Sequence, residues 1–344
     1  MVATASLTET VRAIGLDAGL VAIGVTTAEP FESTRDALEQ RRAAGLADSM
    51  QFTYRNPGRS TDPSRIVSGA SSIVVGAWPT DAGPAPTQAG HGRVGRYAWR
   101  DNYAALRAAL TTVADVLVDA GYVARVVADD NSLVDRAAAH RAGLGWYGKN
   151  ANVLVPGHGS WVVLGSVVTT APLVAHGEPV ADGCGGCTKC IDGCPTAAIV
   201  APGVVDARRC LAWLVQAEGP FPLEYRAALG DRMYGCDVCQ EVCPPSRAAA
   251  RHVPAGATVE SSVDLVALLR ATDEELMERH GRWYIANRDP RYLRRNALIA
   301  LGNAGDPADA AVASLLDRYC SSEDELVAEH ARWARQRLRD RLAS

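Results

Sequence analysis

Residues 184–195 read CGGCTKCIDGCP, and residues 236–244 read CDVCQEVCP. The first stretch has the C-x2-C-x2-C-x3-C-P spacing of bacterial ferredoxins, in which the fourth cysteine binds the other of two clusters. The second stretch repeats the end of that pattern, and Cys210, well upstream, is the candidate for its missing first cysteine. Together these thiols predict two [4Fe-4S] clusters, each held by four thiolates.

A crossed arrangement assigns the cysteines to the two clusters. Three neighbouring cysteines bind one cluster, and the fourth reaches the other. Zinc ribbons and disulfides fit less well, because structural zinc sites usually close a set of four ligands with two C-x2-C pairs. Cys320 lies apart in a helical pattern, and we interpret it as a buried structural thiol. The predicted ligands are Cys184, Cys187, Cys190 and Cys243 for the first cluster, and Cys194, Cys210, Cys236 and Cys239 for the second.

Length and composition are typical of an intracellular enzyme. The chain has 344 residues, which suggests two or three domains of about 100–200 residues each. Its N-terminus lacks the basic and long apolar segments of a secretory signal, and no apolar run approaches the roughly 18 residues of a membrane span. Dense cysteine without such a signal indicates metal binding in a reducing compartment. We therefore expect a cytoplasmic monomer with no membrane partner.

Hydrophobic patterning divides the chain into three predicted domains. The first alternates helix-like and strand-like segments, as in an α/β layer domain. The second contains the cysteine motifs and is expected to be ferredoxin-like. The third is almost entirely helical in pattern. The predicted domains are residues 1–178, 179–250 and 251–344.

Within the first domain, short apolar runs predict individual strands. We expect strands at 20–26, 72–77 and 122–128, and a helix through the apolar repeat that begins at Leu106. The glycine-rich turn at 156–160 predicts a hairpin between the apolar runs on its two sides.

The third domain combines a helical repeat with an excess of arginine. Residues 294–307 predict a helix ended by glycine and a tight turn, and further helices follow, as in a HEAT repeat. The net charge of the chain is −4, but arginines outnumber acidic residues between 281 and 300. Such a stripe can hold phosphates. The alternative is a solvated face of terminal helices.

The run from Asp129 to Asn150, DDNSLVDRAAAHRAGLGWYGKN, carries a family resemblance when read with the other motifs. Glycines at 143, 145 and 148 predict either close backbone approach to a large ligand or a turning connection. The chain resembles the epoxyqueuosine reductases over nearly its full length. The other segments that carry the resemblance are Gly157 to Leu164, the cysteine series, Arg226, Tyr234 to Cys239, and Arg294 to Pro307.

This resemblance implies a reaction, cofactors and partners. Such enzymes reduce the epoxide of epoxyqueuosine, at the wobble position 34 of tRNA, to the alkene of queuosine. Two [4Fe-4S] clusters pass electrons to cobalamin in the α/β domain, with cob(II)alamin at rest and cob(I)alamin when active. No nucleotide-binding motif is visible in this chain, so we expect a ferredoxin or flavodoxin-type protein as the electron donor.

The resemblance also assigns a proton donor. Asp129 matches the catalytic acid of the family, and burial against a flat apolar ligand would raise its pKa so that it stays protonated. Asp130 is the alternative acid, although it also suits the N-cap of a helix that begins near Leu133.

Further site residues follow from the same match. The tRNA candidates combine Arg226, in the segment after Cys210, with three arginines of the helical repeat. The predicted cobalamin-binding residues are Arg59, Asp129, Arg136, Lys149, Asn150, Val153 and Leu164, and the tRNA candidates are Arg226, Arg291, Arg294 and Arg295.

Two other classes of protein share parts of this pattern. A reductive dehalogenase-like corrinoid enzyme has the same cofactors, but usually carries an exported leader and a tyrosine acid, for which Tyr147 is the candidate here. A non-enzymatic iron–sulfur electron carrier would need the cysteines and a helical scaffold without a corrinoid.

Overall fold

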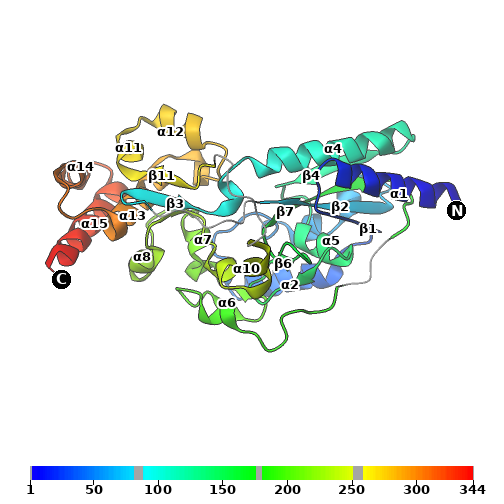
Figure 1. The fold of residues 1–344 in the computed structure, drawn as a ribbon, viewed down its shortest axis with the longest axis horizontal. Helices are drawn as coiled ribbons and strands as arrows, with labels where there is room; N and C mark the ends of the chain where they lie inside the picture. The colour runs from blue at the N-terminus through cyan, green and yellow to red at the C-terminus, as the bar shows by residue number, and fades with distance from the viewer. Residues whose placement is uncertain (1, 81–87, 176–179, 251–258, 344) are drawn as a thin grey trace.

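The computed structural model describes residues 2–80, 88–175, 180–250 and 259–343 (Figure 1). The helix α1 lies at one end of the long axis and the C-terminal helices lie at the other, with the cysteine-bearing segment below and between them (Figure 1). Within the described ranges, none of the helices is long and apolar enough to cross a membrane.

An antiparallel four-stranded sheet forms the centre of the N-terminal region. Its order is β1-β2-β7-β4. The side chains of Ile73 and Val75 pack on one face and that of Val74 packs on the other, and all three are fully buried. A sheet covered on both faces explains why this strand reads as a continuous apolar run. The strands are β1 (Ala22–Thr27), β2 (Ser72–Pro79), β4 (Ala124–Ala128) and β7 (Val162–Thr169).

Helices cover both faces of this sheet. Leu106, Leu110, Val113 and Leu117 recur at helical spacing, and all four are buried on the face that α1 also covers. The opposite face packs against α5 and the segment around α2. The elements of this region are α1 (Val2–Asp17), α2 (Glu32–Ala43), α3 (Pro57–Ser60), η1 (Pro63–Arg65), α4 (Asn102–Asp119) and α5 (Asp135–Arg141).

The predicted hairpin around residues 156–160 is wrong. Strand β6 (Val153–Leu154) pairs with β5 (Trp146–Tyr147), while β7 belongs to the main sheet. Only a single bridge, between Val155 and Gly159, remains of the expected pairing. The apolar run of β7 extends to Thr169 because β2 and β4 pair with it on both sides, which leaves no edge for a hairpin partner.

A second sheet joins segments from all three predicted domains. Strand β3 (His91–Val94) lies between β10 (Arg232–Tyr234) and β11 (Ser262–Asp264). The C-terminal region is therefore not purely helical, because β11 is too short to show strand periodicity in the sequence. The predicted boundary after residue 178 lies outside the described residues, and the one after residue 250 lies at their edge.

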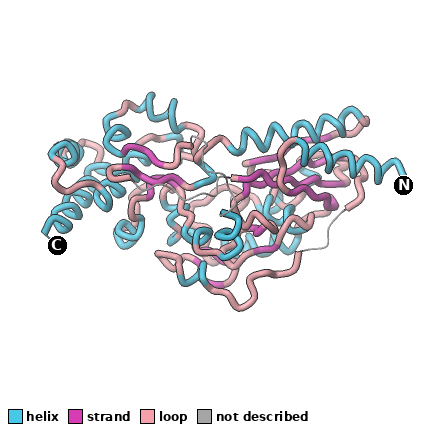
Figure 2. Tube along the Cα trace, viewed as in Figure 1, coloured by secondary structure: helices cyan, strands magenta, loops and turns pink. Residues whose placement is uncertain are grey.

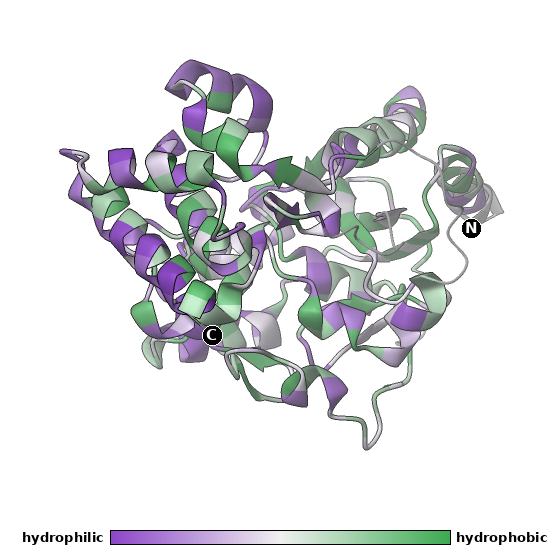
Figure 3. Ribbon diagram, turned by 60° about the vertical axis from the view of Figure 1, so that its left-hand side comes forward, coloured by the Kyte–Doolittle hydropathy of each residue, from purple (hydrophilic) through white to green (hydrophobic). Residues whose placement is uncertain are grey.

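The C-terminal helices share a core with this small sheet. The helix α13 ends at Gly305, as predicted, and Gly302 allows close approach to α15, since a Cβ there would lie 2.7 Å from the Cα of Ala334. Hydrophilic and hydrophobic residues alternate around these helices (Figure 3). The described helices are α11 (Leu265–Arg270), α12 (Asp273–His280), η4 (Ala286–Arg288), α13 (Arg291–Ala304), α14 (Ala310–Cys320) and α15 (Glu325–Ala343).

The cysteine-bearing segment consists of short elements joined by long loops (Figure 2). Its first helix, α6, starts at Lys189 inside the first cysteine motif. The elements are α6 (Lys189–Asp192), β8 (Ile199–Ala201), β9 (Val204–Val205), η3 (Ala207–Arg209), α7 (Leu211–Leu214), α8 (Leu223–Leu229), α9 (Val238–Glu241) and α10 (Pro244–Ala250). The short helix η2 (Arg96–Ala98) connects β3 to α4.

Candidate active site with two thiol quartets

The thiols predicted for the first cluster are neighbours in the structure. Burial raises the pKa of Cys190, and the thiols of Cys243 and Cys184 add to this effect. Burial likewise raises the pKa of Cys243, whose neighbours include Cys184 and Cys187. The helices α6 and α9 pack together and bring the two motifs into contact. The distant Cys243 therefore lies with the first motif, as the crossed arrangement requires.

The remaining four cysteines form a second group. Burial raises the pKa of Cys239 well above its usual value, and Cys236, Cys210 and Cys194 all contribute. Burial raises the pKa of Cys236 to about 11. The sulfur of Cys194 accepts a hydrogen bond from the backbone N–H of Ala198 at 3.2 Å. The outlying Cys210 thus belongs with this group.

The two groups suit iron–sulfur cubes better than single ions or disulfides. All nine cysteines are free, and Cys320 is partly buried against the C-terminal core. Among the described residues, no three His, Cys, Asp or Glu side chains lie close enough to hold one metal ion. A cube of four irons spreads its thiolates more widely than a single ion does. Because burial raises the pKa values, metal binding would release protons from these thiols.

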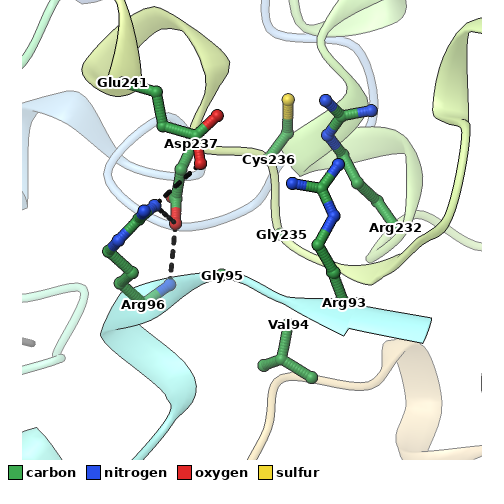
Figure 4. A pocket seen from close by; sticks show the side chains of 9 residues that line it. All are labelled: Arg93, Val94, Gly95, Arg96, Arg232, Gly235, Cys236, Asp237 and Glu241. Atoms are coloured by element: carbon green, nitrogen blue, oxygen red, sulfur yellow. Dashed lines mark hydrogen bonds and ion pairs between the residues drawn. The ribbon is translucent and has the colours of Figure 1, made fainter. Parts of the chain in front are cut away.

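Arginines surround the second quartet. Figure 4 shows the guanidinium groups of Arg93 and Arg232 on the same side as the sulfur of Cys236, around a small cavity of about 20 Å³. Space of that size holds about one water molecule, so it is no cofactor pocket. Arg93 is paired with Asp231 through a 2.7 Å contact, whereas Arg232 donates to the carbonyl of Leu229 at 2.9 Å.

The buried Arg96 anchors the second cysteine motif to β3. Its backbone N–H donates to the Oδ2 of Asp237 at 2.8 Å, and its side chain donates to Glu241 at 2.9 Å. The guanidinium lies 4.5 Å from the ring centre of Trp161, which contributes a cation–π contact. This residue, which sequence reasoning missed, holds the second motif against the α/β region.

Asp129 follows β4 directly and has the left-handed φ of +56°. Because Ala128 pairs with Gly165, the register places Asp129 opposite Leu164. Burial raises its pKa although the residue keeps an exposed surface, and Arg107 opposes the shift. No described residue donates a hydrogen bond to this carboxyl group. It is therefore available to a substrate.

Asp130 has a different role from its neighbour. Its Oδ1 accepts hydrogen bonds from the backbone N–H of Ser132 at 2.7 Å and from the Ser132 hydroxyl at 2.5 Å. The expected N-cap role is wrong, because α5 starts at Asp135 and Val134 precedes it without a side-chain cap. Asp130 instead stabilises the turn that presents Asp129.

A second carboxyl group near Asp129 lacks a partner. The Oδ1 of Asp135 is buried without a hydrogen bond among the described residues, and burial raises its pKa well above the usual value. Tyr103 faces both carboxyl groups, and its pKa is raised mainly by burial. A buried acceptor without a donor leaves a place for a water molecule or a ligand group.

The predicted cobalamin-binding residues divide into two sets. Arg59 and Arg136 lie at the Asp129 loop: Arg59 donates to the hydroxyl of Ser132 at 3.3 Å, and Arg136 donates to the carbonyl of Ala151 at 2.7 Å. Leu164 is partly buried on the same face of the sheet. Arg136 is also among the charges that act on the thiol of Cys210. Arg136 therefore links this loop electrostatically to the second quartet.

The other three candidates are already engaged with the protein. The Nζ of Lys149 donates to the carbonyl of Gly185 at 2.7 Å, in the first cysteine motif. Asn150 donates to the carbonyl of Cys239 at 3.4 Å, in the second. The side chain of Val153 is 3% exposed in the core. Their contacts join the α/β region to the cysteine motifs, which sequence reasoning did not foresee for Lys149 and Asn150.

The glycines of the same run serve internal packing. A Cβ at Gly145 would lie 2.2 Å from the carbonyl oxygen of Leu154, and one at Gly148 would lie 2.7 Å from the Oδ1 of Asn150. Gly143 has a φ of +72°, which turns the chain after α5. Of the two alternatives, the turning connection is supported.

Two of the four arginines predicted to touch tRNA are buried. Arg295 is 0% exposed and donates to the carbonyls of Leu214, Ala217 and Gly219. Arg226 is 2% exposed and donates to Glu329 at 2.7 Å. Neither guanidinium can reach a bound RNA, so these two predictions are wrong.

The other two arginines are paired with acidic groups. Arg291 is half exposed and contacts Asp289 and Asp324. Arg294 is mostly buried beside Asp273. An open hollow of about 630 Å³ lies between α11 and α12 and contains no predicted site residue.

Two groups of four thiols are the ligand set of an iron–sulfur protein with two clusters. A family model described as a 4Fe-4S double cluster binding domain matches residues 183–246. The epoxyqueuosine reductase of Lactococcus garvieae (strain Lg2) is 32% identical to this chain, over 98% of this chain and 97% of that relative. The epoxyqueuosine reductase of Bacillus subtilis (strain 168) is 32% identical, over 97% and 87%.

Solved structures agree with these relatives. A crystal structure of epoxyqueuosine reductase with an epoxyqueuosine-modified stem loop of tRNA-Tyr superimposes with a TM-score of 0.88 at 30% identity, covering 97% of this chain and 90% of that one. The chain belongs to the epoxyqueuosine reductase family. Such relatives favour neither the dehalogenase-like nor the electron-carrier alternative.

Proposed function

We propose that this chain reduces the epoxide of epoxyqueuosine in tRNA to the alkene of queuosine. The observation that carries the proposal is Asp129, a carboxyl group of raised pKa with no hydrogen-bond donor among the described residues, at a loop whose Arg136 also acts on the thiol of Cys210. An acid at a site that is linked electrostatically to a thiol quartet suits a reduction that also consumes protons. Membership of the family and a relative solved with an epoxyqueuosine-modified stem loop support the substrate.

The residues around Asp129 fit a bound cobalamin. The buried Oδ1 of Asp135 needs a donor, and the amide side chains of a corrinoid can provide one. Arg59 and Arg136 offer guanidinium groups at the same loop, and Leu164 offers apolar surface. We assign these four residues to the cofactor site. Cobalamin would supply a cobalt centre that passes electrons from the clusters to the epoxide.

The stoichiometry of the reaction requires a proton donor, and we assign that role to Asp129. Converting the epoxide to an alkene and water consumes two electrons and two protons. Asp129 donates a proton to the oxygen that leaves, because burial raises its pKa and so favours the protonated carboxyl group. The hydrogen bonds of Asp130 to Ser132 hold the turn and so orient this proton.

The broader organisation follows the same proposal. Residues 1–178 hold the cofactor, residues 179–250 hold the clusters, and residues 251–344 form a HEAT-like helical part that faces tRNA. Arg291 and Arg294 stay candidates for that contact at the start of α13. The electron donor is a ferredoxin or flavodoxin-type protein, and the enzyme acts as a monomer in the cytoplasm.

Anaerobic turnover of epoxyqueuosine-containing tRNA with added cobalamin tests the proposal. Mass spectrometry of the nucleosides should detect queuosine with the wild-type chain and only a trace with Asp129→Ala. A solved relative from Bacillus subtilis, in which a catalytic aspartate loop is swung out of the active site, is consistent with an acid on a loop. Absence of queuosine with wild-type protein that contains both clusters and cobalamin would refute the function.

A further inference from the structure

Exposed aromatic rings are rare on this molecule. Among the described residues, only Tyr147 and Tyr284 are large aromatic side chains with an exposed fraction as high as 41%. Tyr147 belongs to the connection after α5 and lies 5.1 Å from the ring of His140. Tyr284 lies outside every regular helix and strand, between α12 and η4. Its exposure is not explained by the proposed function so far.

Two other aromatic rings support Tyr284 from the protein side. Phe52 lies 5.2 Å from it between ring centres, and Trp213 lies 6.5 Å from it. Trp213 is 4% exposed, and its Nε1 donates to the carboxylate of Asp48 at 2.8 Å. The three rings come from three distant segments of the chain. Tyr284 is therefore exposed to solvent while it packs against two other aromatic rings.

The backbone after Tyr284 holds this ring in place. Asn287 and Arg288 both have a φ of +53°, a left-handed conformation that is strained for residues other than glycine. Side-chain contacts stabilise the two residues: Asn287 donates to Glu218 at 3.0 Å, and Arg288 donates to the carbonyl of Gly281 at 3.0 Å. Consecutive strained residues persist where the surrounding structure requires them, and such places are often ligand sites.

The aromatic group borders the candidate active site. The hydroxyl of Tyr234 donates to the backbone carbonyl of Tyr284 at 3.2 Å, and the charge of Asp129 acts on Tyr234. On the opposite side, Cys210 of the second quartet packs against the small core around Trp213. Tyr284 therefore lies between Tyr234, on which the charge of Asp129 acts, and the core around Trp213 that Cys210 joins.

We propose that Tyr284, backed by Phe52 and Trp213, is a stacking platform for an unpaired base of the tRNA anticodon loop next to the reacting base. Proteins recognise single-stranded RNA loops mainly by stacking unstacked bases on aromatic side chains. Exposed arginines lie close in sequence to two of the rings, Arg55 beside Phe52 and Arg288 beside Tyr284, and can hold the adjacent phosphates. This inference rests on the proposed function.

Variants of Tyr284 separate stacking from simple packing. Tyr284→Leu keeps apolar bulk and removes the aromatic face, whereas Tyr284→Phe keeps the face and removes the hydroxyl. Leu223→Ala is the control for loss of an exposed apolar side chain, because Leu223 is 63% exposed on α8. Iron content and melting temperature show that each variant is folded and holds its clusters.

The probe is a synthetic anticodon stem loop with 2-aminopurine at one loop position beside the wobble base, tested at each neighbouring position in turn. Binding to wild-type protein should quench the fluorescence at one position, since stacking quenches 2-aminopurine. Tyr284→Leu should remove that quenching and weaken binding by about 5- to 140-fold, the range for loss of one stacked base. Tyr284→Phe and Leu223→Ala should behave like wild type.

The outcomes distinguish this inference from the function on which it rests. Quenching that persists in Tyr284→Leu, or that is lost equally in Tyr284→Phe, overturns the stacking platform while wild-type turnover still supports the function. Quenching that depends on the aromatic ring supports the platform, even where the nucleoside assay detects no queuosine.

Discussion

The two thiol quartets are similar in ligands and different in surroundings. In the first motif Gly185, Gly186, Thr188 and Lys189 are exposed between the cysteines. The chain has only two lysines, and the other one, Lys149, donates a hydrogen bond to the carbonyl of Gly185 in the same motif. The first quartet therefore lies beneath an exposed loop with ammonium groups beside it, and its Cys190 and Cys243 are themselves buried.

The second quartet has partly exposed cysteines but buried residues around its second motif. Its motif is preceded by the buried Tyr234 and Gly235, and the buried Asp237 lies within it. Guanidinium groups instead of ammonium groups face it, and Arg136 connects it electrostatically to the Asp129 region. We infer that the first cluster receives electrons from the donor and that the second passes them to the catalytic side.

Removing one cysteine ligand from each quartet in turn should give the largest difference in turnover between the two quartets. Cys210→Ala should lose the second cluster and abolish turnover with any reductant, because no relay then remains beside Asp129. Cys184→Ala, the matched control, should lose the first cluster and turnover with a protein donor, yet keep a measurable rate with a small chemical reductant. Iron analysis and nucleoside assays give both results. A rate in Cys210→Ala equal to that in Cys184→Ala would contradict the order.

The catalytic side should show its own pH dependence. Because burial raises the pKa of Asp129, the protonated acid is present at lower pH, and kcat/KM should fall as the pH rises through that pKa. Asp129→Asn should lower the rate by about 10²- to 10⁴-fold, as for loss of a general acid, and should remove the fall of kcat/KM with rising pH. Asp130→Asn should keep that fall. The reverse pattern would assign the acid to Asp130.

Acid should release the second cluster before the first. Burial lowers the pKa of His330 to about 4. The neutral ring accepts from the N–H of Phe221 at 3.1 Å and lies 2.7 Å from the carbonyl of Leu326, and Phe221 shares a core with Cys236. A histidine in the unfolded chain titrates near pH 6.5. The contribution of His330 to stability is therefore present above pH 6.5 and is lost as the pH falls to about 4.

Urea unfolding and cluster absorbance between pH 7 and pH 5 measure this effect. The loss is on the order of 3 kcal/mol in full, since each pKa unit corresponds to about 1.4 kcal/mol. His330→Gln should flatten the pH dependence of unfolding. Earlier loss of the first cluster on acidification would show that the scaffold around His330 does not support the second.

The smallest effect concerns the charges beside each quartet. Arg232→Gln removes a positive charge that faces Cys236, so the reduction potential of the second cluster should fall while that of the first stays constant. Lys149→Met should shift the first cluster alone. Redox titration followed by electron paramagnetic resonance separates the two signals. Equal shifts of both clusters in either variant would contradict separate surroundings.

Several features could be predicted because they are encoded locally. Cysteine spacing grouped the thiols into the two quartets that the structure brings together. The continuous apolar run of β2 and the helical repeat from Leu106 gave their elements correctly. Asp129 lies at the end of β4, where the pattern placed it. Such patterns depend only on residues close in sequence.

Other features depended on segments far apart in the chain. Arg295 looked like a surface charge, but carbonyl groups from the α7 region enclose it and burial lowers its pKa to about 9. The pairing of β3 with β10 and β11 and the rings beneath Tyr284 likewise join distant segments.

The sequence by itself determined two groups of four cysteines, an aspartate after a buried strand and a family. The tertiary structure alone decided which arginines are exposed, which charges reach each quartet and which aromatic side chains meet the solvent. The physical reason is that spacing controls local backbone and ligand order. Burial and electrostatic neighbours depend on groups that only folding brings together.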